Sequence, residues 1–587
     1  MERISIFLVV CFAFISNIHA HDVVVNGIYY NLLKKANTAE VTKESGRYTS
    51  YSGTVDIPEK IEVEGTTYTV TKIASGTFSY CKELVSVSIP NTIISIDDNA
   101  FSNCTSITSL YLPESIISIG KEAFRNCSAL TEINLPANLS SIGEGAFSYC
   151  KGISSIIIPN SLKYINSKTF SNCNKLKKVI LHNSLEGIGS HAFEYCIALE
   201  PLELPESLES LGAYAFSGCS KWESVTIPNK IKRISNGLFS GCSKLKTIIM
   251  PNGITEIGGY SFQSCNAIEN FTIPDGVISI GKYAFVFCGN LKSITIPPSL
   301  KYYGSYAFDG CKNLTDVNIK SLESWCQNEF ENYTATPFFS ASDLYLNGSK
   351  LTKLEIPNSI EKLNDFAFWG CKSLEEIIMS DSVKEIGKYV FTGCRNLKSV
   401  IMSNSLKDTG YSTFINCEKL TYIDFGENIV SIDEYAFSKC HDLEYLKIPN
   451  SVKYINRQAF SYCENLKNVS LGKSVLKIAN DAFSGCENLE SVTCYAIKTP
   501  EASTSTFYNC YVEYSTLNVP LESIDAYKST KPWSDFGTIK PLETTSEIKL
   551  ICTKKTVNPN IYNLNGQKLY FPIKGINLIN RKKILVK

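Results

Sequence analysis

Cysteine is the residue type in this sequence with the widest chemistry, because thiolates bind metals, act as nucleophiles and pair as disulfides. The chain has 22 cysteines among its 587 residues. A cysteine-based metal site needs closely spaced ligands such as C-x-x-C, and that spacing occurs nowhere in the sequence. We therefore predict that the protein holds no metal and no cofactor.

Other residue types used in catalysis are scarce. Histidine occurs at positions 19, 21, 182, 191 and 441, and the sequence has no G-x-S-x-G motif or phosphate-binding glycine loop. The 57 basic and 57 acidic side chains balance, so no charge excess favours binding to nucleic acid. We predict a protein that is not an enzyme and does not bind nucleic acid.

The cysteines follow a fixed period. Seventeen of them recur every 23 residues, in one series from Cys81 to Cys311 and another from Cys371 to Cys486. A phenylalanine stands three residues before each of them, and a large apolar residue stands three residues after. Such a register predicts stacked repeats, because a single unit cannot bury its own apolar face.

Each repeat contains the pattern of a short strand followed by turns. The segment 291–297 alternates apolar and polar residues and ends at Pro297, as expected for a strand with one buried face. Seven residues before many of the cysteines stands a glycine, such as Gly120, which predicts a turn with positive φ. The Ala-Phe-x-x-Cys segment that follows, such as 123–127, predicts one short helical or 3₁₀ turn.

The repeated cysteines are predicted to be buried thiols rather than disulfides. Equivalent positions of stacked repeats point the same way, which is not the opposed geometry that a disulfide needs. Cys494, Cys510 and Cys552 fall outside the 23-residue register and remain candidates for pairing.

The repeat pattern L-x-x-I-x-I-P…I-G-x-x-A-F-x-x-C, which covers residues 55 to about 540, resembles the BspA-type leucine-rich repeats of bacterial surface proteins. The resemblance implies an α/β-type repeat solenoid. It would be a right-handed leucine-rich-repeat solenoid with a parallel β-sheet along one face and about 17 regular repeats plus caps. It also implies adhesion to host matrix or plasma proteins and contact with other bacteria.

The amino terminus has the pattern of a secretory signal peptide. Residues 1–3 are Met, Glu and Arg, an apolar stretch follows over 4–15, and a short segment from Ser16 leads to Ala20, after which we expect cleavage. No later stretch is long and apolar enough to cross a bilayer, so we expect no transmembrane segment in the mature chain. The predicted location is extracellular or attached to the outer surface.

The carboxy-terminal tail, 543–587, predicts two short strands with a glycine turn and ends in basic residues. It is similar to the sorting domains of the type IX secretion route in Bacteroidota, which implies a sorting or anchoring role. The alternative is a final β-hairpin that decorates the cap.

These patterns divide the chain into segments with distinct expected structures. The predicted segments are a signal peptide (1–20), an amino-terminal β-rich cap (21–72), a first repeat array (73–319), an irregular interruption (320–348), a second repeat array (349–495), a carboxy-terminal cap (496–542) and the tail (543–587). The interruption is either a degenerate repeat with a surface bulge or a dedicated ligand loop.

The exposed strand positions are the predicted binding face. They are rich in hydroxyl groups in the first array, and Tyr422 and Tyr445 in the second array are predicted to stack as adjacent anchors. The candidate ligand-face residues are Tyr111, Ile378, Ile401, Tyr422, Tyr445 and Trp325. We expect an extracellular protein or glycan ligand, bound over many weak contacts. The alternative is a structural spacer of a surface layer with no specific ligand. The sequence does not predict the oligomeric state.

Overall fold

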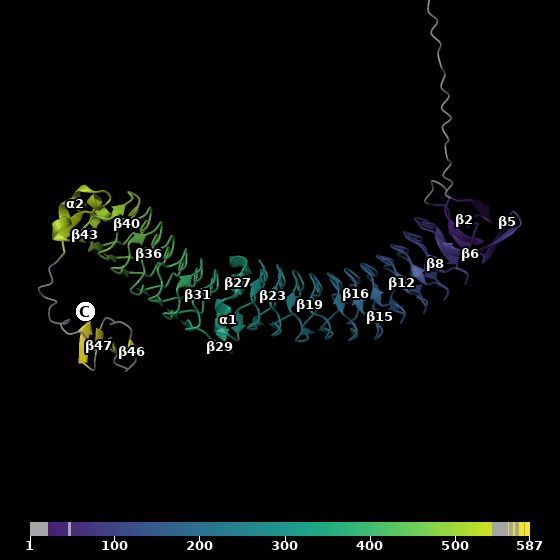
Figure 1. Ribbon diagram of the computed structural model, residues 1–587, viewed down its shortest axis with the longest axis horizontal. Helices are drawn as coiled ribbons and strands as arrows, with labels where there is room; N and C mark the ends of the chain where they lie inside the picture. The colour runs from purple at the N-terminus through teal and green to yellow at the C-terminus, as the bar shows by residue number, and fades with distance from the viewer. Residues whose placement is uncertain are drawn as a thin grey trace, which may run out of the picture.

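The computed structural model describes residues 21–44 and 49–542, together with four strands between residues 561 and 586. Over 49–542 the chain winds into successive coils that stack side by side into one long arc (Figure 1). The fold is a leucine-rich-repeat-like solenoid with parallel sheets, repeats of about 23 residues and little helix. The predicted signal peptide, 1–20, lies outside the described residues.

One strand of nearly every coil belongs to a first set of parallel strands, the first strand set, and the coil of residues 201–205 lacks this strand. Ser155, Ile156 and Ile157 pair in register with the residues 23 positions later, and Ile156 is buried between two exposed neighbours. This is the predicted alternation of buried and exposed residues. The strands of this set are β7 (Leu84–Ser88), β9 (Ser109–Leu110), β11 (Glu132–Ile133), β13 (Ser155–Ile157), β15 (Lys178–Ile180), β18 (Ser224–Thr226), β20 (Thr247–Ile249), β22 (Asn270–Thr272), β24 (Ser293–Ile296), β26 (Asp316–Ile319), β28 (Asp343–Leu346), β30 (Lys353–Glu355), β32 (Glu376–Ile378), β34 (Ser399–Ile401), β35 (Tyr422–Asp424), β37 (Tyr445–Lys447), β39 (Asn468–Leu471), β41 (Ser491–Cys494), β43 (Thr516–Val519) and β44 (Thr538–Pro541).

A second strand set, which the sequence analysis did not predict, precedes the turn of each coil. Its strands are about two residues long and pair in parallel with the equivalent residues of the next coil, as Ser118 does with Ser141. They are β8 (Ser95–Ile96), β10 (Ser118–Ile119), β12 (Ser141–Ile142), β14 (Tyr164–Ile165), β16 (Gly187–Ile188), β17 (Ser210–Leu211), β19 (Arg233–Ile234), β21 (Glu256–Ile257), β23 (Ser279–Ile280), β25 (Tyr302–Tyr303), β27 (Glu329–Phe330), β31 (Lys362–Leu363), β33 (Glu385–Ile386), β36 (Ser431–Ile432), β38 (Tyr454–Ile455), β40 (Lys477–Ile478) and β42 (Glu501–Ala502).

The Ala-Phe-x-x-Cys segment is not helical, contrary to the prediction. In the coil of Cys127, Glu122 and Asn126 have φ values of 52° and 56°, and a right-handed helix cannot contain residues with positive φ. The segment instead forms consecutive turns. Its amides donate to the next coil, as Phe101 N does to Ala123 O at 2.6 Å. Each coil is therefore joined to the next along three sides.

The glycine seven residues before the cysteine has a different role from the predicted one. Among the nine glycines at this position, Gly410 alone has a positive φ, of 74°. At Gly189, a Cβ atom would lie 2.6 Å from Ser167 N in the preceding coil. Glycine is required there because two backbones approach closely, and the left-handed residues lie two and six positions later, as in the coil of Cys127.

The core of the solenoid is a continuous stack of the repeated phenylalanine and cysteine side chains. Phe124 and Phe147 in adjacent coils stack with ring centroids 5.2 Å apart and planes at 3°. From Cys104 to Cys311 and from Cys394 to Cys486, each repeated thiol donates to the carbonyl of the preceding coil's phenylalanine, as Cys265 Sγ does to Phe239 O at 3.1 Å. Between Cys104 and Cys510 every cysteine is buried and none forms a disulfide, which confirms the predicted thiol ladder over that range.

The amino-terminal end is covered by a small β-rich cap. Its strands are β1 (Val23–Val25), β2 (Ile28–Leu33), β3 (Thr38–Thr42), β4 (Gly53–Asp56), β5 (Lys60–Val63) and β6 (Thr66–Ile73). Strand β4 pairs with β7 and strand β6 pairs with β8, so the cap continues both strand sets. The first repeat is thereby shielded from solvent.

The irregular segment 320–348 continues both strand sets through one enlarged coil. Strand β27 pairs with β25, and β28 pairs with β26. The extra residues form α1 (Leu322–Cys326), η1 (Tyr333–Ala335), η2 (Pro337–Phe339) and a hairpin between β28 and β29 (Ser349–Lys350). This arrangement favours the degenerate repeat over the dedicated ligand loop.

The carboxy-terminal end is closed by short helices over the last coils. They are η3 (Val512–Tyr514), η4 (Leu521–Ser523), α2 (Ile524–Ser529) and η5 (Trp533–Asp535). Cys510 extends the thiol ladder, since its Sγ donates to Phe483 O at 2.9 Å. In the tail, β45 (Ile561–Tyr562), β46 (Lys568–Leu569), β47 (Gly575–Ile579) and β48 (Lys582–Val586) form an antiparallel sheet rather than the two strands predicted. Cys552 lies outside the described residues.

Candidate binding surfaces

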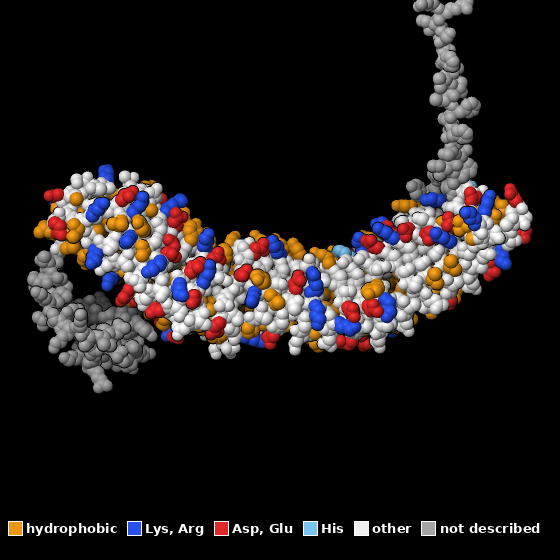
Figure 2. Space-filling model, viewed as in Figure 1, with side chains coloured by type: hydrophobic (Ala, Val, Ile, Leu, Met, Phe, Trp, Pro, Cys, Tyr) orange, Lys and Arg blue, Asp and Glu red, His pale blue; other side chains and the backbone are white. Residues whose placement is uncertain are grey.

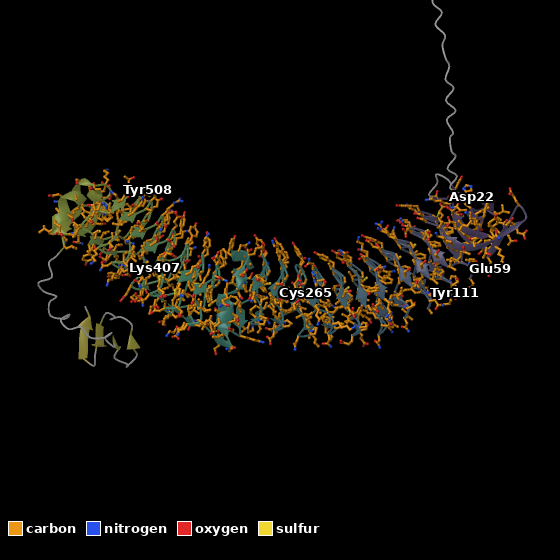
Figure 3. All side chains as sticks on the ribbon, in the orientation of Figure 1. Asp22, Glu59, Tyr111, Cys265, Lys407 and Tyr508 are labelled. Carbon is orange, nitrogen blue, oxygen red and sulfur yellow. The ribbon has the colours of Figure 1, made fainter. Side chains whose placement is uncertain are left out.

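The outward positions of the first strand set carry large exposed side chains. Tyr111, Ile157 and Tyr445 are 67%, 64% and 66% exposed. Figure 3 places Tyr111 in the amino-terminal part of the arc, with Cys265 near its middle. The fold explains the inward residues of these strands, and it leaves the outward ones free for contact with another molecule.

The other predicted face residues lie at outward strand positions of four consecutive coils, with Ile378 and Ile401 third in their strands and Tyr422 and Tyr445 first. Ile378 in β32 is paired with Ile401 in β34, and both are half-buried. Tyr422 follows one coil later in β35, and its pKa is raised by partial burial and by the negative charge of Asp424. Tyr445 lies a further 23 residues along in β37. The structure thus places four of the predicted residues on neighbouring strands of one face.

Trp325 does not belong to this face, and the prediction that it contacts a ligand is wrong. Its side chain is 1% exposed, and its indole N–H donates to Ala367 O at 2.9 Å. The ring packs against Tyr303, Phe330 and Phe338. Helix α1 directs Trp325 into the core together with Leu322 and Cys326, which are also buried.

The pairing of the first strand set is interrupted between β11 and β13 and again after β15. A hollow lies beside each interruption. One hollow of about 680 Å³ lies between β11 and β13 and includes Tyr111, Asn134 and Ile157 in its lining. Between the coils of β9 and β11, the Asn134 side-chain oxygen accepts from Leu112 N and its amide nitrogen donates to Leu112 O, so the side chain takes the place of backbone hydrogen bonds there. A second hollow of about 640 Å³ follows near Pro201, which has no N–H to donate.

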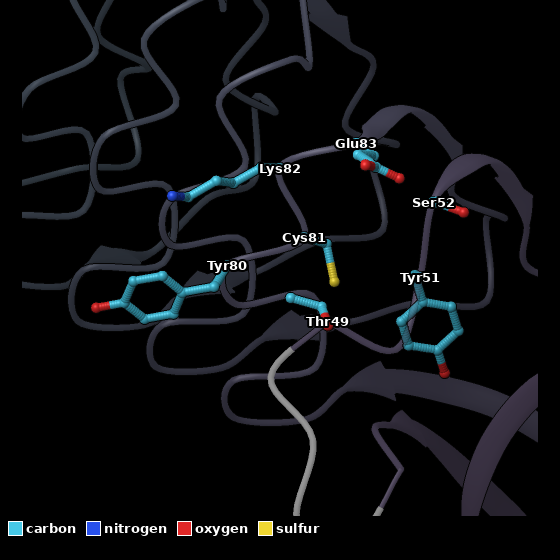
Figure 4. Close-up of a pocket in the computed structure, with 7 residues that line it drawn as sticks. All are labelled: Thr49, Tyr51, Ser52, Tyr80, Cys81, Lys82 and Glu83. Carbon is cyan, nitrogen blue, oxygen red and sulfur yellow. The ribbon is translucent and has the colours of Figure 1, made fainter.

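A third hollow lies where the amino-terminal cap meets the first coil. It measures about 770 Å³ and is lined by Thr49, Tyr51, Ser52, Tyr80, Cys81, Lys82 and Glu83 (Figure 4). Burial raises the pKa of the Cys81 thiol, so the thiol stays protonated near neutral pH. A protonated thiol is not an activated nucleophile. The hollow therefore offers contact area rather than chemistry.

Among residues 21–44 and 49–542, no group of three or more His, Cys, Asp or Glu side chains could hold a metal ion. His191 and His441 are each paired with a glutamate, at 3.0 Å and 3.5 Å. Within the same described ranges, no helix has the length and apolar character needed to cross a membrane.

A second surface, which sequence reasoning missed, runs along the turns. At the position five residues before the cysteine, most coils from Cys196 to Cys440 carry an aromatic side chain with positive φ. We call this set the aromatic row: His191, Tyr214, Tyr260, Tyr283, Tyr306, Phe366, Tyr389 and Tyr435. The same 23-residue spacing that reveals the cysteines would have revealed these residues.

The sequence of the chain matches one protein family over most of its length. The model of the BspA type leucine-rich repeat region matches in six copies, over residues 59–177, 140–269, 256–342, 341–467 and 453–549. No curated protein matches the chain.

Solved structures similar to this chain come from several bacteria. A leucine-rich repeat protein from Bacteroides ovatus is 27% identical, over 74% of this chain and 100% of that one, with a TM-score of 0.47. A leucine rich cell surface protein from Faecalibacterium prausnitzii is 20% identical, over 82% and 94%, with a TM-score of 0.27. The pneumococcal vaccine antigen PcpA is 17% identical, over 90% and 100%, with a TM-score of 0.30. On the family match, this chain belongs to the BspA-type leucine-rich-repeat proteins.

Proposed function

We propose that this chain is an exported surface protein that binds extracellular macromolecules, chiefly proteins, through the outward face of the first strand set. The observation that carries the proposal is the exposure of Tyr111, Ile157 and Tyr445 at positions where the fold requires no particular side chain. Large exposed apolar side chains that line one continuous surface are typical of binding sites.

The shape of the molecule supports this function. A solenoid offers a long surface built from equivalent positions, and such surfaces bind partners over many small contacts. The face combines hydroxyl groups, such as Ser155 and Ser224, with apolar side chains such as Ile401. Repeat proteins of this family are in general non-catalytic binding scaffolds.

An outer-surface location fits the relatives and the chain's own termini. The F. prausnitzii protein is described as a cell surface protein, and PcpA as a vaccine antigen. The proposed route is export through the signal peptide at 1–20, with attachment or sorting through the tail at 543–587. The proposed role is adhesion to host or bacterial macromolecules.

The experiment is a binding screen of the mature chain against immobilised fibronectin, fibrinogen and fixed bacterial cells. We expect saturable binding to at least one of these surfaces. The variant Tyr422→Ala/Tyr445→Ala should bind more weakly, while Tyr454→Ala, a change at an exposed tyrosine of the second strand set, should bind as the wild type does. Failure to bind any surface would favour the spacer, a structural element with no specific ligand.

A further inference from the structure

The aromatic row consists of side chains that the turn itself does not require. All its residues have φ between 54° and 64°, a conformation that is unfavourable for bulky side chains. In other coils the same position holds Asn99, Glu122, Gly145 or Lys168 with similar φ values. The turn therefore forms with many residue types, and its geometry does not explain why rings fill the middle coils.

Where consecutive coils both carry a ring, the rings stack at nearly constant spacing, whereas Tyr435 contacts Tyr411 edge-on at 6.0 Å. Centroids are 5.0 Å apart between Tyr260 and Tyr283, 5.2 Å between Tyr283 and Tyr306, and 5.4 Å between Phe366 and Tyr389. The ring planes in these pairs lie within 13° of parallel. Because neighbours cover the ring faces, the row presents ring edges and phenol hydroxyl groups to solvent.

The coil of Gly237 shows that the row is maintained where a ring is absent. A Cβ atom on Gly237 would overlap the ring of Tyr214, so the tyrosine of the preceding coil lies across this glycine. Tyr214 also stacks on His191 at 5.1 Å and 8°. Because Gly237 has no side chain, the ring of Tyr214 can extend over the position of Gly237 as well as its own.

The enlarged coil extends the row instead of ending it. Phe339 of η2 packs edge-on against Tyr306 at 6.2 Å. Tyr333 of η1 packs on Trp369 of the following repeat at 5.3 Å. Tyr333 and Phe339 are 46% and 36% exposed. The irregular segment thus bridges the rings of the two arrays.

The row contains no carboxylate, lysine or arginine, although 19% of the chain is Asp, Glu, Lys or Arg. At the same position, Lys168 precedes His191, and Gln458 and then Asp481 follow the row. Charged groups meet the row at its two ends, where Glu194 lies 3.0 Å from His191 and the Arg457 guanidinium lies 5.9 Å from the ring centre of Tyr435. Beside the row, Lys282 is held at 2.6 Å by Glu331. An uncharged ligand complements such a strip, because it requires no counter-charge and desolvates no unpaired ion.

The spacing distinguishes between classes of uncharged polymer. In an extended peptide, side chains on one face recur about every 6.7 Å. The rings of the row are 5.0–5.4 Å apart, so peptide side chains and rings would no longer be aligned after a few coils. A glycan chain repeats once per sugar ring, a length close to that of one coil. Its hydroxyl groups pair with phenol groups, which both donate and accept hydrogen bonds.

We propose that the aromatic row is a binding site for a neutral polysaccharide lying along the arc. The proposal rests on the uncharged side chains of the row, its phenol hydroxyl groups and its spacing of one ring per coil. Each coil contributes the same weak contact, and a ligand of matching period adds these contacts together. Figure 2 shows hydrophobic side chains gathered along the concave rim of the arc over its middle coils. This site is separate from the proposed protein-binding face.

The test is affinity electrophoresis of the folded chain in gels containing yeast mannan, laminarin or hydroxyethylcellulose, with polygalacturonate as the acidic comparison. The variant Tyr260→Asn/Tyr283→Asn/Tyr306→Asn removes three adjacent rings while keeping a residue type that the turn accepts at Asn99. The matched control, Tyr111→Asn/Tyr445→Asn, removes two exposed tyrosines from the first strand set. Circular dichroism and thermal melting show whether each variant is folded, and Tyr283→Asn alone replaces the triple variant if that one is not.

We expect at least one neutral polysaccharide to retard the wild type and the control equally. The row variant should need at least a tenfold higher polysaccharide concentration for the same retardation. The proposal is overturned if none of the three neutral polymers retards the wild type, if polygalacturonate alone does so, or if the row variant and the wild type behave alike. If the wild type binds none of the immobilised proteins but is still retarded by a neutral polysaccharide, the result counts against the proposed function and not against this site.

Discussion

Trp325 donates its indole N–H to Ala367 O across 2.9 Å, joining residues 42 positions apart in the sequence. The donor lies in the irregular coil and the acceptor in the Ala-Phe-x-x-Cys segment of the next repeat, where the second array begins. This bond and the packing of the Trp325 ring connect the two arrays through a single core, so the irregular coil is a structural joint.

Replacing Trp325 should weaken that joint. Trp325→Ala removes a buried ring that contacts Tyr303 and Phe330, and we expect a loss of about 3–5 kcal/mol in the free energy of unfolding. Trp325→Phe keeps a ring but leaves the Ala367 carbonyl without its donor, for a loss of about 1–3 kcal/mol. Urea unfolding followed by circular dichroism measures both. Unfolding of Trp325→Ala at the wild-type urea midpoint would contradict this account.

Glycine at the close approach between coils should not tolerate a methyl group. In Gly189→Ala the new Cβ would lie 2.6 Å from Ser167 N, so the backbones must separate, at a cost of about 1–3 kcal/mol. In the control Gly289→Ala the nearest atom is Asn266 Oδ1 at 3.6 Å, an ordinary contact. Thermal melting should show a clear decrease for the first variant and almost none for the second. Equal melting temperatures would mean that the coils are not held this closely.

The thiols of the ladder should not react with thiol reagents while the protein is folded. Burial raises the pKa of the Cys196 and Cys463 thiols to about 12, so these groups stay protonated even at pH 9. Reaction with a disulfide reagent such as DTNB needs an accessible thiolate. We expect the ladder cysteines to react only after denaturation in guanidinium. Rapid titration of many thiols in the native protein would contradict the prediction.

Glu331 should make stability depend on acid pH. Hydrogen bonds from Lys282 and from Ser305 N and Oγ lower its pKa to about 2. Because the folded pKa lies below that of the unfolded chain, the stabilisation is complete above about pH 4.5 and is lost as the pH falls through about 2. The melting temperatures of wild type and Glu331→Gln should therefore differ at pH 7 and converge toward pH 2. A difference that persists unchanged at pH 2 would exclude this cause, and Glu329→Gln, an exposed neighbour, is the control.

The sequence predicted the scaffold well because its signals are periodic. The 23-residue recurrence of Phe and Cys predicted the stacked core, and the alternation around Ile156 predicted the inward and outward faces of the first strand set. The conformation of the turns could not be predicted from residue type. Glycine serves both close approach and positive φ, and its presence in the sequence does not reveal that Gly410 has a positive φ whereas Gly189 does not.

The candidate surfaces were harder to predict. An exposed tyrosine such as Tyr445 can be recognised because it occupies an outward strand position. Trp325 was assigned to the surface because it falls in an irregular segment, and irregular sequence does not reveal whether a side chain turns inward. The aromatic row was missed because Tyr283 and its equivalents share their position with Gly, Asn and Lys in other coils, which hides the pattern in any single repeat.

The most direct test of the account is the dissociation constant of the mature chain for immobilised fibronectin or fibrinogen, measured in parallel for the wild type and Tyr422→Ala/Tyr445→Ala. Truncating two aromatic anchors in a binding face typically costs about 1–2 kcal/mol or more each, so the variant should bind at least about tenfold more weakly. Its melting temperature should stay close to that of the wild type, since Tyr445 is 66% exposed. Equal dissociation constants for the two proteins would contradict the claim that the outward face of the first strand set binds the ligand.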